Sequence, residues 1–215
     1  MYGCWQFEEG RARGGLEALE PFVAGMVEQY PLLPAWRSAI VYLYAMLDRP
    51  DEIIPHLGIL AADDFATLPF DSNWLIGMAV LIHACVAIGD RNRCARLYEL
   101  FLPYRQYQVT VGMPAASVGS AELPLALAAG TVERWDVADD HFTRAIAANE
   151  HAGNRTWTVH GKYEYGRLLA RRADPKDQPR IRELLRDCMA GSTDMGMTRV
   201  VEQVRTLADA AGVEL

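Results

Sequence analysis

The residue types that support metal binding or catalysis are spread along this sequence without forming a known site. Its histidines are His56, His83, His141, His151 and His160. They form no HExxH motif, no Cys/His pair has the spacing of a zinc site, and no GxSxG, GxGxxG or Ser-x-x-Lys motif occurs. Adjacent carboxylates such as Asp139 and Asp140 would point in different directions on a helix. We therefore expect no metal, no cofactor and no enzymatic activity, although a triad built from distant positions would escape a motif search.

Net charge and hydropathy argue against several classes of protein. The chain has 21 basic and 28 acidic residues, a net charge of −7, which counts against nucleic acid as its main partner. Its longest apolar stretch, Trp74 to Ile88, is interrupted by His83 and is shorter than the ~20 residues of a membrane helix. No two of the four cysteines form a CxxC pair, as is typical of free thiols in a reducing compartment. We expect a cytoplasmic protein without a membrane partner.

Apolar residues recur every three or four positions along most of the chain, which is the pattern of amphipathic helices. The segments with this pattern are 16–30, 36–47, 53–60, 91–104, 121–132, 137–149, 156–170, 181–189 and 198–211. The stretch 74–88 is apolar nearly all round and is expected in the centre of the protein. Only Gln108 to Val111 has a strand-like pattern. The sequence therefore predicts an all-α protein.

One short pattern recurs four times on the second of two predicted helices. It is a small or medium residue, a large apolar residue four positions later, and another apolar residue three positions after that. The copies are Ile53/Leu57/Leu60, Cys94/Tyr98/Phe101, Ala138/Phe142/Ala145 and Ile181/Leu185/Cys188. The third copy matches the second helix of a tetratricopeptide repeat, although the period exceeds the ~34 residues of that repeat, and a HEAT-type array is the alternative. We expect a single domain over residues 1–215, a solenoid of about four helical hairpins with a concave groove.

Several short words of sequence point to a family. They are Leu33-Pro34-Ala35-Trp36-Arg37, Asn73-Trp74-Leu75, Ala95-Arg96-Leu97-Tyr98-Glu99-Leu100 with Pro103-Tyr104, Gly119-Ser120, Arg134-Trp135-Asp136, and Asp140-His141-Phe142 followed by Ala145 and Asn149. In this order, from about Glu9 to Leu207, they resemble the C-terminal helical-repeat region of LuxR-type (MalT-like) ATPase regulators. The related cyclase–ATPase–repeat proteins of actinobacteria share this region.

The resemblance implies a non-catalytic scaffold for protein interaction or signal sensing in a transcriptional regulator. Its partner would be a protein or peptide segment bound in the concave groove, including the ATPase domain of the parent regulator. The alternative is a small-molecule effector that binds in the same groove. The phosphate loop GxxxxGK[ST] of the family's ATPase is absent. The sequence is therefore interpreted as a fragment or a stand-alone relative of the repeat region.

A long connection between two predicted helices is the first candidate binding element. Residues 105–120 exceed the usual ~2–8 residues of a helix–helix connection, and such loops are often functional. We expect this loop to line the groove as a flap, with Arg105, Tyr107, Ser117 and Ser120 available to a ligand. The alternative is a packed spacer that sets the angle between repeats.

The first helices of the repeats supply the second set of candidates, because they would line the concave surface. These residues are Asn73, Trp74, His83, Glu122, Trp157, His160, Tyr163 and Glu164. Aromatic residues with polar groups are common at binding hot spots. The alternative is that Trp74 and Trp157 fill the core and that His83 is a hydrogen-bonded core histidine.

The N-terminal segment is predicted to promote self-association. Glu9-Gly10-Arg11 resembles a turn between repeat helices, which leaves the helix at 16–30 with only a short partner before it. An unpartnered helix exposes its apolar stripe, here Leu16, Leu19, Val23 and Met26. We therefore expect a homodimer that forms through the N-terminal helix.

Overall fold

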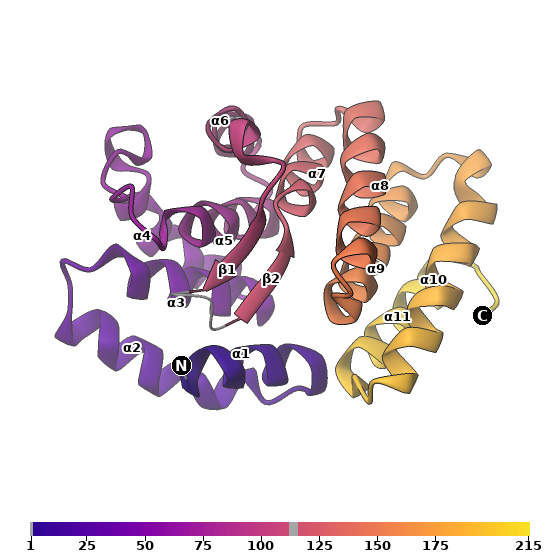
Figure 1. Cartoon of the computed structure of the whole chain (residues 1–215), viewed down its shortest axis with the longest axis horizontal. Helices are drawn as coiled ribbons and strands as arrows, with labels where there is room; N and C mark the ends of the chain where they lie inside the picture. The colour runs from indigo at the N-terminus through magenta and orange to yellow at the C-terminus, as the bar shows by residue number, and fades with distance from the viewer. Residues whose placement is uncertain (1, 112–115) are drawn as a thin grey trace.

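The chain folds almost entirely into helices in a computed structural model that describes residues 2–111 and 116–215, with side chains from Trp5 onward (Figure 1). The α-helices are α1 (Tyr2–Arg13), α2 (Glu20–Gln29), α3 (Pro34–Met46), α4 (Pro50–Leu60), α5 (Trp74–Ala87), α6 (Arg91–Phe101), α7 (Glu122–Thr131), α8 (Trp135–His151), α9 (Arg155–Arg172), α10 (Gln178–Asp194) and α11 (Thr198–Ala211). Short 3-10 helices lie at Leu16–Leu19, Ala62–Phe65, Leu102–Tyr104 and Pro175–Asp177. Two antiparallel strands, β1 (Gln108–Val111) and β2 (Ala116–Ser120), form a hairpin between α6 and α7. The predicted all-α class is confirmed, and the strand-like pattern at Gln108 to Val111 is a strand.

Helices that follow one another in sequence pack against one another. Helix α3 contacts α4 and α5, α5 contacts α6 and α7, α7 contacts α8, α9 contacts α8 and α10, and α10 contacts α11. The turns within these pairs place one residue in the left-handed region: Asp48 (φ 56°), Gly89 (φ 68°), Glu133 (φ 61°) and Ala173 (φ 56°). A left-handed residue ends a helix because it turns the chain back and satisfies its last carbonyls. The result is a series of antiparallel helix pairs, visible from left to right in Figure 1.

A continuous apolar core runs through the whole series, from Leu16 to Val213. All twelve residues of the recurring pattern on α4, α6, α8 and α10 are buried. Phe142 of α8, for example, stacks on Tyr165 of α9 with their ring centroids 4.9 Å apart. Helix α7 is buried along its entire length, and α5 is buried from Gly77 to Ile82. These two helices form the centre of the protein, as their apolar composition predicts for α5.

The predicted turn at Glu9 to Arg11 is wrong, because these residues lie inside α1. A Cβ at Gly10 would come within 2.8 Å of the Leu16 side chain, so this glycine allows close packing and does not turn the chain. The turn is made by Gly14 (φ 97°) and Gly15 (φ 88°). Helix α1 is consequently longer than the sequence suggested.

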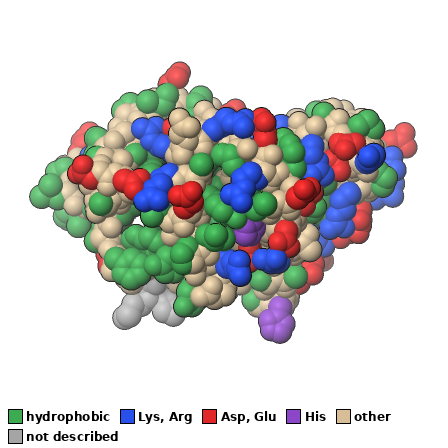
Figure 2. Space-filling view, turned by 90° about the horizontal axis from the view of Figure 1, so that it is seen from above, with side chains coloured by type: hydrophobic (Ala, Val, Ile, Leu, Met, Phe, Trp, Pro, Cys, Tyr) green, Lys and Arg blue, Asp and Glu red, His purple; other side chains and the backbone are tan. Residues whose placement is uncertain are grey.

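The predicted exposed stripe on the N-terminal segment is also wrong. Leu16, Leu19 and Val23 are buried and Met26 is half-buried, because this segment packs against α1 and α3. Large apolar side chains that are exposed lie elsewhere in this part of the chain, at Phe22, Leu32, Ile54 and Ile59. Figure 2 shows a group of hydrophobic side chains on the left half of the molecule. The homodimer stays a prediction without the stripe that motivated it.

The first and last helices of the chain lie against each other. Arg13 Nε donates to the carbonyl of Gly196 (3.2 Å), and the Thr198 hydroxyl donates to the carbonyl of Arg13 (3.3 Å). Arg199 on α11 also donates to the carbonyl of Met46 at the end of α3. The two ends of the helix series are therefore joined, and the side chains between them face an interior. Among the described helices, none combines the length and the apolar character needed to cross a membrane.

Candidate functional site

Six polar or aromatic side chains from four helices meet in this interior. They are Arg11 of α1, Tyr42 of α3, His83 of α5, and Trp157, His160 and Glu164 of α9, and we call them the Arg11 cluster. The α9 members share one helix face because they are three and four positions apart. Asn154 fixes the start of α9, since its side-chain Oδ1 accepts the backbone N–H of Trp157 (3.3 Å). We call the surface that the α3, α5 and α9 members present to α1 the inner face.

Arg11 is the central charge of the cluster, although only 6% of its surface is exposed. Its Nη1 donates to the Tyr42 hydroxyl (3.2 Å), and its guanidinium carbon lies 3.6 Å from the centroid of the Trp157 ring. A guanidinium stacked on an indole in a desolvated place is a favourable cation–π pair. Burial opposes the charge, but Glu8 and Tyr42 outweigh it and leave the pKa of Arg11 raised. The cluster thus holds a cation inside the protein.

The two histidines of the cluster are neutral at pH 7. Burial, reinforced by the charges of Arg11 and Arg167, lowers the pKa of His83 to about 3. Burial and Arg11 also lower the pKa of His160 well below its ordinary value. The imidazole of His83 meets the edge of the Tyr42 ring with centroids 5.5 Å apart. Both imidazole rings are therefore uncharged polar groups near the charge of Arg11.

Besides Glu164 Oε2, which meets Arg167 only as an ion pair, three nitrogen atoms of the cluster are buried without a hydrogen-bond partner among the described residues. They are Arg11 Nε, Trp157 Nε1 and His160 Nε2. Leaving such an atom unpaired costs about 1–3 kcal/mol. Native proteins rarely contain such unpaired buried atoms, and those that occur are frequently at functional sites. In this interior the hydrogen bonding of the polar atoms is therefore less complete than the packing of the apolar side chains.

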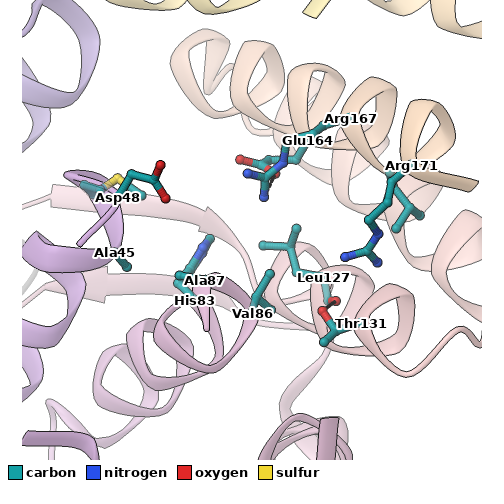
Figure 3. Close-up of a pocket in the computed structure, with 12 residues that line it drawn as sticks. Ala45, Asp48, His83, Val86, Ala87, Leu127, Thr131, Glu164, Arg167 and Arg171 are labelled. Atoms are coloured by element: carbon teal, nitrogen blue, oxygen red, sulfur yellow. Dashed lines mark hydrogen bonds and ion pairs between the residues drawn. The ribbon is translucent and has the colours of Figure 1, made fainter. Parts of the chain in front are cut away.

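A cavity of about 260 Å³ adjoins the cluster and shares His83 and Glu164 with it (Figure 3). Its apolar walls include Met46, Val86, Leu127 and Leu168. Its charged residues are Asp48, Glu164, Arg167 and Arg171. Asp48 and Arg171 lie at opposite ends of the view in Figure 3, and Glu164 and Arg167 lie between them. The cavity thus offers both charge signs and apolar walls to a small ligand.

The two arginines of the cavity differ in their partners. Arg167 forms an ion pair with Glu164 (2.7 Å), and this carboxylate raises the pKa of Arg167. Arg171 donates to the carbonyl of Gly130, and burial together with the charge of Arg167 lowers the pKa of Arg171. Arg171 is the cavity charge that an added anion would stabilise most.

The sequence-predicted residues on α9 are brought together at this site. Trp157 and His160 belong to the cluster, and Tyr163 is half-buried on the next turn, where burial and Glu164 raise its pKa. Sequence reasoning missed Arg11, since Glu9 to Arg11 was interpreted as a turn, and missed Tyr42, which lies in an apolar run. The small neighbours Gly10 and Ala12 are the signal that a helix bearing Arg11 can approach another closely.

Other predicted residues lie away from the inner face. Asn73 is exposed at the start of α5, and Trp74 packs against Phe70 and Tyr104 with centroids 5.1 Å and 4.8 Å apart. Tyr107 is 52% exposed and lies beside Tyr104. Arg105 is exposed at the rim of a separate hollow. These four residues are not gathered with the Arg11 cluster.

The predicted loop at 105–120 is a hairpin that packs on α5, α8 and α9. Its residues 112–115 lie outside the described residues. The Ser120 N–H donates to Asn149 Oδ1 (2.9 Å), and the Ser117 hydroxyl accepts from Asn154 Nδ2 (3.2 Å). The two serines are thus occupied by contacts to α8 and to the turn before α9, which agrees with a packed spacer. Gly119 lies between the two serines and packs against Trp157, which is a residue of the inner face.

Gly119→Ala is expected to lower the free energy of unfolding by about 2 kcal/mol. Gly119 has a φ of 88°, a backbone conformation that residues with a side chain rarely adopt. An added Cβ would lie 3.0 Å from atoms of Trp157. Gly25→Ala is the matched control, because Gly25 lies in α2 with open space around it, and should stabilise by about 0.5–1 kcal/mol. Urea unfolding of both variants measures the difference. Equal effects would contradict the close contact.

Glu122, a predicted groove residue, instead joins a buried hydrogen-bonded chain with His141 and Tyr98. The Glu122 carboxylate accepts from His141 Nδ1, and the Tyr98 hydroxyl bonds His141 Nε2 (2.9 Å). Because an ionised carboxylate only accepts, His141 Nδ1 is the donor toward Glu122. All three side chains are buried, and the hydrogen bonds among them connect α6, α7 and α8.

A hollow of about 350 Å³ lies beside this chain on the outer side of α6 and α8. It is lined by Tyr98 and His141 and by three arginines, Arg105, Arg134 and Arg144. Arg144 pairs with Asp140 (2.6 Å), and Arg134 lies over the Tyr98 ring at 4.8 Å. The hollow is separate from the Arg11 cluster.

Metal and thiol chemistry find little support in the described part of the chain. There, no group of three or more His, Cys, Asp or Glu side chains is arranged to hold a metal ion. Cys85, Cys94 and Cys188 are buried free thiols. The contact with Cys94 and burial raise the pKa of Cys85, and burial raises the pKa of Cys188 to about 12. Cys85 and Cys188 therefore stay protonated at pH 7, and all three cysteines act as core residues.

Comparison with protein families, with curated proteins and with solved structures finds no match for this chain.

Proposed function

We propose that the chain is a non-catalytic scaffold of tetratricopeptide-like helical hairpins that binds a helical segment of a partner protein on its inner face. Four hairpins, α3/α4, α5/α6, α7/α8 and α9/α10, follow one another, and each carries the recurring apolar pattern on its second helix. Stacked hairpins of this kind share one core and present their first helices on one surface. Apart from Arg11, the members of the Arg11 cluster lie on first helices, which supports the assignment of the inner face as the binding surface.

The observation that carries this proposal is that the inner face already holds a helix. Helix α1 lies against it through Arg11, which contacts α3 and α9. Phe7 of α1 also stacks on Tyr42 with ring centroids 5.6 Å apart. The surface therefore has the shape and the polar groups to accept one helix. Binding of a helix in a groove is a common mode of peptide recognition.

The resemblance to LuxR-type regulators supports the ATPase domain of such a regulator as the partner. In that interpretation the chain acts in the cytoplasm and passes a signal to the ATPase. The test is titration of the full chain with purified ATPase domains of LuxR-type regulators from the same genome, followed by hydrogen exchange. Binding that protects amides of α3, α5 and α9 supports the proposal. Binding that protects only the outer helices α4, α6, α8 and α10, or no binding, overturns it.

A small-molecule sensor is the second candidate, and the cavity of about 260 Å³ favours it. A ligand that binds only the folded chain stabilises it by RT ln(1 + [L]/Kd), which is about 1.4 kcal/mol at ten times Kd. We expect a thermal shift with small metabolites that carry an anionic group, because Arg171 lacks a carboxylate partner among the described residues. Arg171→Gln should abolish the shift while Arg182→Gln, at an exposed position, should keep it. A shift of equal size in both variants would exclude the cavity as the site.

A further inference from the structure

We propose that α1 is a built-in occupant of the inner face, and that the partner helix replaces α1 by placing an arginine where Arg11 now lies. This inference rests on the proposed function and adds the chemistry of the partner. It also implies that the binding surface is closed until α1 leaves.

The Arg11 position is built for a guanidinium. The Trp157 ring covers one side of the guanidinium plane at 3.6 Å, and the Tyr42 hydroxyl accepts one of its N–H groups at 3.2 Å. Glu164 adds a negative charge close enough to raise the pKa of Arg11. A lysine ammonium is more strongly hydrated and presents no planar fork, so it would fit this position poorly.

The receiving residues do not depend on α1 for their positions. Tyr42 lies on α3 and Trp157 and Glu164 lie on α9, and both helices are packed within the hairpin series. The Trp157 ring is supported by Gly119 of the hairpin, which lies against it. Glu164 is also held by Arg167. The site would therefore remain formed when α1 moves away.

Helix α1 is joined to the rest of the chain by a pair of glycines and by solvent-exposed hydrogen bonds, in addition to its buried contacts. Gly14 and Gly15, which join it to the rest of the chain, both have positive φ and open space around them. Its hydrogen bonds to α11, made by Arg13, are exposed to solvent. Trp5 is 63% exposed, and Arg11 Nε is buried without a hydrogen-bond partner in the described part of the chain. These exposed contacts and the unpaired Nε are the features that would let a competing helix exchange with α1.

The contacts of α1 define what a competing helix must carry. Phe7 and Arg11 are four residues apart, so they project from one helix face, and both contact Tyr42. The partner segment is therefore a helix with an aromatic residue followed four positions later by an arginine. Its arginine stacks on Trp157 within the field of the Glu164 charge, and its aromatic ring meets Tyr42.

The test uses a labelled synthetic peptide of residues 2–13 as a model of the partner helix. Fluorescence anisotropy measures its binding to the full chain and to the full-chain variant Arg11→Ala. In the unchanged chain α1 competes with the peptide at a high effective concentration, so we expect at least about tenfold tighter binding to the variant. Peptides with Arg11→Lys and Arg11→Ala serve as matched controls and should each bind the variant at least about tenfold more weakly.

A second chain variant, Phe7→Ala, loosens α1 while it keeps the buried charge, and covers the case in which Arg11→Ala does not fold. It should also bind the peptide more tightly than the unchanged chain. Equal binding by the unchanged chain and both variants, or equal binding of the arginine and lysine peptides, would overturn the inference. A partner domain that protects α3, α5 and α9 while the amides of α1 stay protected would overturn it too, but would leave the proposed function in place. Failure of both the peptide and the partner domains to bind the inner face overturns both.

Discussion

His141→Leu is expected to lower the free energy of unfolding by about 3 kcal/mol or more, because a buried carboxylate that loses its hydrogen-bond donor costs more than the ~1–3 kcal/mol of a neutral group. The substitution leaves the Glu122 carboxylate buried without its hydrogen-bond donor and removes the hydrogen-bond partner of the Tyr98 hydroxyl. Helix α7, which carries Glu122, is buried along its length, and Glu122 itself is buried. Urea denaturation followed by circular dichroism measures the loss.

Two control variants separate the buried charge from simple loss of packing. Glu122→Leu combined with His141→Leu removes both partners and is expected to lie within about 1–2 kcal/mol of the unchanged chain. Tyr98→Phe removes one neutral hydrogen bond and is expected to cost about 1–2 kcal/mol. If the double variant were less stable than His141→Leu alone, the loss would come from packing and the charge argument would fail.

Acidification from pH 7 to pH 4.5 is expected to destabilise the chain by about 3 kcal/mol through His83 alone, with a further loss through His160. Burial and the nearby Arg11 and Arg167 hold the pKa of His83 at about 3 in the folded chain, against about 6.5 when unfolded. Between these two pKa values His83 is therefore protonated in the unfolded chain and neutral in the folded chain. The contribution of His83 to the free energy of unfolding is fully present above about pH 6.5 and is lost as the pH falls toward 3.

The groups that face these histidines determine the size of this effect. Arg11 and Arg167 oppose protonation of His83, and Arg199 on α11 adds to the effect of Arg11 on His160. His83→Asn, which is neutral at every pH, should make the stability profile shallower by about 3 kcal/mol between pH 7 and pH 4.5. Proton NMR of the folded chain should find no titration of the His83 ring in this range. Titration near pH 6.5 would show that the ring is solvated and would exclude the buried arrangement.

The helix pairs were predictable from the sequence because their information is local. The spacing of apolar residues has the period of a helix, and the copies Ile53/Leu57/Leu60 and Ala138/Phe142/Ala145 each mark a buried face. The turns between them carry residues such as Asp48 and Gly89, which adopt positive φ and end a helix. Each of these signals depends on neighbours within about ten residues of one another.

The candidate site was predicted in its α9 half and at His83 of α5. Trp157 and His160 stand on a predicted first helix, whereas Arg11 lies at a position that a local reading treats as a turn. The difference arises because burial of Arg11 depends on contacts with Tyr42 and Trp157, far away in sequence. Glu122 was expected in the groove for a related reason. Its helix is buried on all sides, so only the position of His141 decides where the carboxylate points.

The joint between the two ends of the chain bears on how this protein folds. Its hydrogen bonds join residues 183, 185 and 153 positions apart, whereas the hairpins are built from neighbours. Local contacts form quickly, and closing a loop of this length costs entropy that a few solvent-exposed bonds repay poorly. The hairpins should therefore assemble early and the terminal joint last, so that a late kinetic phase reports the arrival of α1. A fusion partner attached at Tyr2 would act on that late step and leave the assembly of the hairpins unaffected.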